Sequence, residues 1–161
     1  MQILEVNNNR LKALPDDLGN LTALENLSIS NNLVATLPEL TGCQQLKVLI
    51  AHSNQLRRLD DTLGYLPQLA SIDLSNNHLV ELPEDFQYLA SLTYLNLRFN
   101  RIGHLPQHLG RLHRLQFVDV SMNELAYIPQ SCSGLTKLSL CSIERNGISD
   151  IAGNLLFSQE L

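Results

Sequence analysis

One pattern recurs along the whole of this 161-residue chain at an almost constant spacing. Residues 69–83 read L-x-x-I-x-L-x-x-N-x-L-x-x-L-P, and the same pattern returns upstream and downstream. The copies start at residues 1, 24, 46, 69, 92, 115 and 138, so every step is 23 residues except one of 22. A fixed period of this length predicts a stack of similar structural units, each of which buries its apolar side against its neighbours.

Each unit combines a strand signal with an invariant turn signal. Positions 4 and 6, counted from the start of a unit, are apolar and alternate with variable positions, which predicts a short strand with one buried face. A proline at position 15 argues against a long helix in the rest of the unit. Position 9 is asparagine in every unit: Asn9, Asn32, Asn54, Asn77, Asn100, Asn123 and Asn146. Because a carboxamide both donates and accepts hydrogen bonds, we expect a ladder that satisfies backbone groups at a sharp turn.

Departures from the period mark the ends and the outer side of the stack. The second unit lacks one residue between Pro38 and Leu40, and we expect the deletion on the outer side, where it leaves the strand register intact. Asp60 stands where other units have proline, and the seventh unit degenerates from Ala152 onward. We interpret residues 1–161 as a single domain with no separate capping domain. The degenerate end fits either a terminal cap or a boundary within a longer protein.

The motif L-x-x-L-x-L-x-x-N-x-L resembles the leucine-rich repeat family, and the tail L-P-x-x-L-x-x-L is similar to its 23-residue intracellular and bacterial repeats. This resemblance implies an α/β fold, a right-handed solenoid shaped as a horseshoe arc. A parallel sheet would line its concave face, and short helical or irregular segments its convex face. It also implies a non-catalytic module that binds a protein partner on the concave face. The alternative is the sensing or substrate-recruiting part of a larger signalling enzyme or bacterial effector, with its kinase, ubiquitin ligase or GTPase-like domain outside this chain.

Composition narrows the class of partner. The net charge is −5 and the signs are interspersed, which argues against nucleic-acid or membrane-surface binding. No run of about 18 apolar residues indicates a membrane span. Cys43, Cys132 and Cys141 replace core leucines, so we expect three buried thiols in a reducing compartment. We therefore expect a cytoplasmic monomer, or alternatively a bacterial effector delivered into a host cell.

The sequence contains no recognised catalytic or cofactor motif, such as a P-loop or G-x-S-x-G. His104, His108 and His113 lie close together, at positions 13, 17 and 22 of one unit. We interpret them as solvated side chains on the outer surface, because a metal site at this spacing would need a regular helix that Pro106 disfavours. We expect no catalytic residue, no metal and no cofactor.

Equal positions in successive units should form columns on the sheet, and the columns of positions 3 and 8 carry unusual residues in units five to seven. Aromatic and apolar residues with nearby arginines are typical of interaction hot spots. The predicted protein-binding residues are Tyr94, Arg98, Phe99, Arg101, Phe117, Met122, Asp73 and Asp119. The four apolar residues would anchor the partner, the arginines would pair with its acidic groups and the aspartates would set register. Alternatively, Phe99 and Met122 pack on each other, or the C-terminal tail covers Phe117 and Leu140. Val48, Ile50 and His52 form a second, weaker patch.

Overall fold

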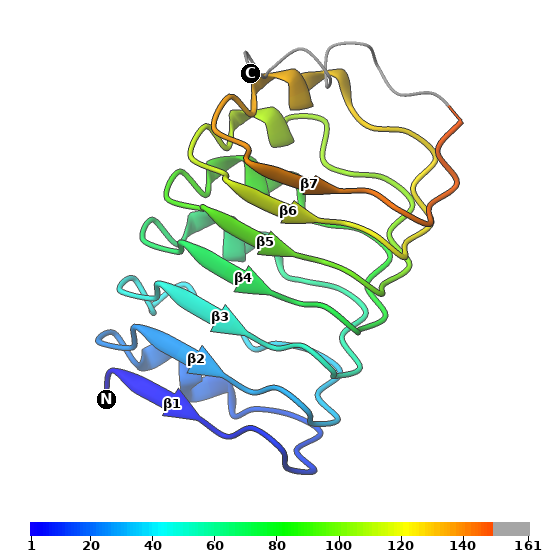
Figure 1. Ribbon diagram of the computed structural model, residues 1–161. Coiled ribbons are helices and arrows are strands. Elements are labelled where there is room, and N and C mark those ends of the chain that lie inside the picture. The colour runs from blue at the N-terminus through cyan, green and yellow to red at the C-terminus, as the bar shows by residue number, and fades with distance from the viewer. Residues whose placement is uncertain (150–161) are drawn as a thin grey trace.

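Each repeat contributes one three-residue strand to a single parallel sheet, in the computed structural model that describes residues 1–149 (Figure 1). The strands lie side by side in sequence order and pair in register, so that Tyr94 lies opposite Phe117 and Leu95 opposite Val118. Their bounds are β1 Ile3–Glu5, β2 Asn26–Ser28, β3 Val48–Ile50, β4 Ser71–Asp73, β5 Tyr94–Asn96, β6 Phe117–Asp119 and β7 Leu140–Ser142. The prediction of seven short parallel strands is confirmed, and each occupies positions 3–5 of its unit.

The coils rise in a right-handed sense. In Figure 1 the chain crosses the front as a strand, returns behind the sheet and climbs by one strand per turn. This is the hand that the twist of parallel strands favours. The predicted right-handed solenoid is therefore confirmed, with the sheet as one face and the connecting segments as the other. We call the solvent-facing side of the sheet the sheet face.

The outer side of the solenoid carries short 3-10 helices, and residues 1–149 contain no α-helix. These helices are η1 Asp16–Asn20, η2 Asp61–Tyr65, η3 Glu84–Tyr88, η4 Leu109–Arg111 and η5 Gln130–Gly134. Proline precedes η1, η3 and η5, where its fixed φ suits a helix start. The second unit, which is one residue shorter, has no such helix, so the deletion falls on the outer side as expected.

Asp60 replaces the proline before η2 without loss of the helix. Its carboxylate accepts a hydrogen bond from the backbone N–H of Thr62 at 2.9 Å, which makes it the N-cap of the helix. Hydrogen bonds from the Thr62 hydroxyl and N–H hold the pKa of Asp60 below its ordinary value. At this position a side-chain hydrogen bond from Asp60 therefore replaces the fixed φ of proline as the feature that favours the helix start.

The core lies between the sheet and the outer segments and is almost entirely aliphatic. Strand side chains at position 4, such as Leu49, Ile72 and Leu95, are fully buried. Among residues 1–149, Phe86 in η3 is the largest fully buried side chain. Stacked leucines of this kind stabilise a solenoid because every internal coil buries both of its apolar faces against neighbours.

Two of the three cysteines occupy this core, and the third corrects the prediction. Cys43 and Cys132 are buried, but Cys141 is exposed. Cys141 lies in β7, the last described strand, where all three residues are less buried than in the internal strands.

No helix within residues 1–149 has the length and apolarity that a membrane crossing requires. The degenerate part of the seventh unit from Ala152 lies outside the described residues.

Candidate functional site

A left-handed residue at position 8 turns the chain at the end of every strand. The seven φ values fall between 54° and 58° and belong to Asn8, Asn31, Ser53, Asn76, Phe99, Met122 and Arg145. Asparagine adopts this conformation with little strain, whereas a bulky side chain in it is an outlier. The sequence interpretation assigned the turn to position 9 and missed this requirement. The asparagines at position 8 of units one, two and four were the signal that could have revealed it.

The asparagine at position 9 ties each coil to the one before it. Asn77 donates from Nδ2 to the carbonyl oxygens of Leu74 and Ser75 in its own coil, at 3.0 and 3.2 Å. It also donates to Ala51 O of the preceding coil at 3.0 Å, and its Oδ1 accepts from Leu56 N of that coil at 3.0 Å. Corresponding bonds to the preceding coil recur at the other asparagines of the ladder from Asn32 onward.

Asn9 is the exception because no described coil precedes it. It is exposed, and its Nδ2 donates only to Val6 O and Asn7 O of its own turn, both at 3.0 Å. The ladder is therefore a scaffold that holds position 8 at the same height in each coil. Where position 8 is large, its side chain is presented on a rigid turn.

Tyr94 and Phe117 form an aromatic platform on the sheet face. Their ring centroids are 4.5 Å apart and their planes differ by 8°, so the rings stack across β5 and β6. Both side chains are half-buried. Burial, together with the negative charges of Asp73 and Asp119, raises the pKa of the Tyr94 phenol above its ordinary value. Tyr94 therefore offers a neutral hydroxyl donor at neutral pH.

Phe99 lies in the turn that follows β5 and carries a cation on its ring. The Arg98 guanidinium carbon lies 4.9 Å from the Phe99 centroid, and Arg98 Nη1 is 3.9 Å from Asp119 Oδ2. Phe99 is 48% exposed, and Met122 is half-buried, with its sulfur 3.9 Å from Arg145 Nη1. Arg98 is thus already balanced by Asp119 within the chain.

The two predicted register residues are also occupied by local bonds. Asp73 Oδ1 accepts from the backbone N–H and the hydroxyl of Ser75, at 3.0 and 2.7 Å. Asp119 Oδ1 accepts from Ser121 N at 2.9 Å. These carboxylates orient the turn and Arg98, while each keeps acceptor capacity on the sheet face.

Arg101 belongs to a different surface from Arg98. It follows the turn and lines a groove with side chains of the two preceding coils, on the segments that return behind the sheet. His104, His108 and His113 are exposed, and within residues 1–149 no group of three or more potential ligands is placed to hold a metal ion. The structure thus brings together Tyr94, Phe117 and their neighbours on the sheet face and separates Arg101 from them.

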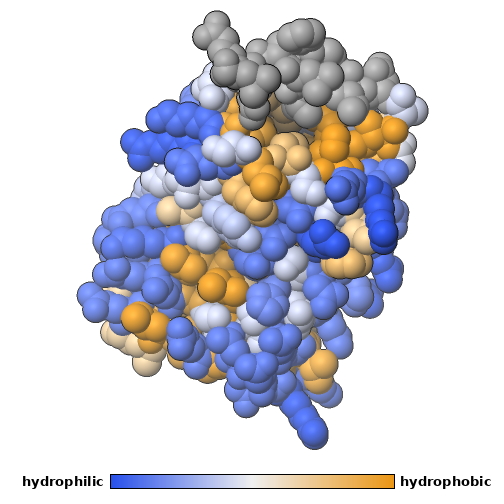
Figure 2. Space-filling view, viewed as in Figure 1, coloured by the Kyte–Doolittle hydropathy of each residue, from blue (hydrophilic) through white to orange (hydrophobic). Residues whose placement is uncertain are grey.

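Figure 2 shows two areas where apolar side chains gather on the sheet face, one over β3 and the other over β6 and β7. The first corresponds to half-buried Val48 and Ile50. The second includes Leu140, which is 49% exposed, and half-buried Phe117. Of these two areas, the one over β6 and β7 includes Phe117 of the aromatic platform.

Comparisons with known proteins point to one family. A family model described as Leucine rich repeat matches residues 44–102. A leucine-rich repeat protein of Leptospira interrogans is 25% identical and superimposes with a TM-score of 0.81, over 98% of this chain and 46% of that one. The ectodomain of an Arabidopsis thaliana membrane receptor kinase is 32% identical with a TM-score of 0.81, over 88% of this chain and 18% of that one.

An internalin from Listeria monocytogenes shares the fold, with a TM-score of 0.83 at 22% identity, over 96% of this chain and 45% of that one. A search of curated protein sequences finds no match. The chain spans less than half the length of each of these three solved structures.

Proposed function

Because this chain is a leucine-rich repeat protein and hence of a family of protein-interaction modules, we propose that it binds one protein partner on the sheet face of repeats four to six. The contact residues are Tyr94 and Phe117 of the platform, with Phe99 and Met122 at the turns beside it. The proposal assigns these residues a binding role and no catalytic step.

The observation that carries this proposal is the left-handed conformation of Phe99 and Met122, at φ values of 55° and 56°. A bulky residue with such a φ costs about 1–2 kcal/mol relative to a right-handed one, and asparagine adopts it far more readily. Three of the first four units place asparagine there. Phe99 and Met122 destabilise their turns, and Phe99 is also half exposed. A partner that covers both side chains would account for their presence at these positions.

The platform supplies the remaining features of a hot spot. Stacked rings fixed across two strands lose little conformational freedom on binding, since the ladder already holds their coils in place. Tyrosine, phenylalanine and methionine are enriched at the buried centres of interfaces. The rim is polar, because Asp73, Asn96 and Arg98 surround the rings on β4 and β5 and the following turn.

The Arabidopsis thaliana receptor ectodomain supports the proposal, because it was solved in complex with CASPARIAN STRIP INTEGRITY FACTOR 2. A fold that accommodates a ligand in that protein provides an extended surface in this one. We expect the side chains on the sheet face of this chain to determine which partner it binds. A partner that inserts an apolar side chain between Phe117 and Met122, and offers an acceptor to the Tyr94 hydroxyl, would use every anchor.

The experiment begins with capture of a partner by the tagged chain and its identification by mass spectrometry, followed by calorimetric titration with the purified partner. Phe117→Asp should weaken binding by at least about 30-fold, because hot-spot truncations typically cost 2 kcal/mol or more. His108→Asp, on the outer surface, is the matched charge control and should bind as wild type.

Folding must be checked separately, because Phe117 is half-buried and stacked on Tyr94. Loss of this pair should lower the free energy of unfolding by about 1 kcal/mol. Phe99→Asn removes an anchor while relieving the strained turn, so it should weaken binding without loss of stability. If His108→Asp abolishes binding and Phe117→Asp does not, the partner uses the outer face and the proposal is wrong.

A further inference from the structure

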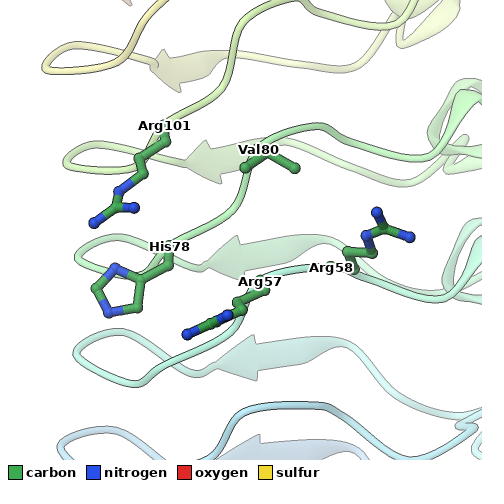
Figure 3. Close-up of a pocket in the computed structure, with 5 residues that line it drawn as sticks. All are labelled: Arg57, Arg58, His78, Val80 and Arg101. Carbon is green, nitrogen blue, oxygen red and sulfur yellow. The ribbon is translucent and has the colours of Figure 1, made fainter.

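A basic groove lies on the return segments of repeats three to five, behind the turns. It has a volume of about 440 Å³ and is lined by Arg57, Arg58, His78, Val80 and Arg101. Figure 3 shows that Arg57, His78 and Arg101 come from three successive coils and project to the same side, while Arg58, on the same coil as Arg57, points the opposite way. Among the described residues, no carboxylate lines this groove.

The arginines of the groove form no ion pair within residues 1–149. The two ion pairs in residues 1–149 are Lys47–Glu25 and Arg98–Asp119, and neither involves a groove residue. The protein carries 16 acidic and 11 basic residues, so three arginines in one groove run against its overall charge. Like charges held close together repel one another, and an anionic ligand would relieve that repulsion.

We infer that the basic groove binds an extended acidic peptide segment of a protein partner, with carboxylates at alternate positions paired to Arg57 and Arg101. Successive coils stack at about 4.8 Å, so the first and third are about 10 Å apart. Alternate side chains of an extended peptide lie about 7 Å apart, a separation that flexible arginine side chains can match across this span. Guanidinium groups suit the purpose because they pair with carboxylates in a bidentate manner.

The groove also adjoins the surface proposed above. Phe99 and Arg101 flank the buried Asn100 in a single turn, so one faces the platform and the other the groove. A partner that crosses this turn would contact both. The inference nevertheless stands on different residues from the proposed function, and each can fail without the other.

We expect Arg58 to contribute less than Arg57 and Arg101 to binding of an acidic peptide, because it also borders a neighbouring hollow. That hollow is lined by Arg58, Asp61, Glu81, Glu84 and His104, among others. Its acidic side chains partly offset the charge of Arg58 and would repel an acidic segment. The ligand is therefore confined to the side of the groove formed by Arg57, His78 and Arg101.

The test uses a seven-residue peptide of alternating serine and glutamate with a neutral dye, followed by fluorescence anisotropy at low salt. The wild-type protein should bind it saturably, and binding should weaken as salt is raised. Arg57→Glu and Arg101→Glu should each weaken binding by at least about tenfold, and Arg57→Gln by less, because reversal replaces attraction with repulsion. The matching peptide with lysine in place of glutamate should not bind.

Two controls separate this site from its alternatives. Lys12→Glu makes the same change of charge at the position in the first repeat that Arg57 occupies in the third, and should bind as wild type. Phe117→Asp should also bind the acidic peptide normally, which distinguishes this site from the sheet face. The inference is overturned if the peptide does not saturate, if both arginine reversals leave binding intact, or if Lys12→Glu weakens it equally. It is also overturned if inorganic phosphate at equal concentration displaces the peptide completely, since the groove would then be a small-anion site.

Discussion

Replacement of Asn77 by leucine tests whether the asparagine ladder holds the coils together. Asn77 is 5% exposed and makes four hydrogen bonds through its carboxamide. The three carbonyls that it serves each keep another donor, from a neighbouring ladder asparagine or from a backbone N–H. Within residues 1–149 the N–H of buried Leu56 has no acceptor other than Asn77 Oδ1.

The magnitude follows from that single orphaned donor. A buried N–H without a partner costs about 1–3 kcal/mol, and leucine is apolar and of similar size, so Asn77→Leu should lower the free energy of unfolding by that amount. With a urea m-value of about 2 kcal/mol per molar, a loss of about 2 kcal/mol moves the midpoint by about 1 M. The m-value itself should not change if the whole solenoid still unfolds together.

Asn9→Leu is the matched control. Asn9 is exposed and bonds only to its own turn, so its replacement should cost less than about 1 kcal/mol. Urea unfolding followed by circular dichroism measures both variants. Equal midpoints for Asn77→Leu and wild type would refute the reasoning, and so would an equal loss in Asn9→Leu, because the ladder would then contribute nothing between coils.

Three further changes test other parts of the solenoid. Gly110→Ala should lower the free energy of unfolding by about 1–3 kcal/mol, because the added Cβ would collide with a backbone carbonyl of the next coil. Gly103→Ala is the control, because open space surrounds that position, and equal urea midpoints for the two variants would contradict the prediction. Iodoacetamide should modify exposed Cys141 in the folded protein faster than buried Cys132, because the reagent reaches it. Desolvation raises the pKa of both thiols, that of Cys132 to about 11, and peptide mass spectrometry that found Cys132 modified first would contradict this order. Asp60→Ala should cost about 1 kcal/mol at neutral pH. Because hydrogen bonds lower the Asp60 pKa from 3.8, this stabilisation is present above that value and lost as pH falls through the lowered one, so wild-type and variant thermal midpoints should converge in acid.

The register of the solenoid could be predicted from the sequence because a fixed period leaves little choice. Once Ile72 and Leu95 occupy the same position in successive units, parallel in-register pairing follows, as the sheet confirms. The same logic placed the deletion after Pro38 on the outer side, where a 3-10 helix is missing. The buried asparagines were also predictable in kind, since an invariant carboxamide among apolar positions needs backbone partners.

The end coils show where that logic stops. A periodic pattern treats Cys141 as equivalent to the core leucines, yet the residue is exposed in the last described strand. Burial depends on which neighbours a coil has, and the pattern of one unit does not contain that information. Asn9 differs from Asn77 for the same reason at the other end.

The sequence by itself determined the stack, the strand positions and the columns of the sheet face, because these depend only on periodicity and on which residues are apolar. The tertiary structure alone decided that bulky Phe99 and Met122 are held in the left-handed turn, that Tyr94 and Phe117 stack and that Arg98 pairs with Asp119. It also gathered Arg57 and Arg101 from separate coils into one groove. These features depend on backbone dihedrals and on the convergence of side chains between coils, which the spacing of residues along the chain does not specify.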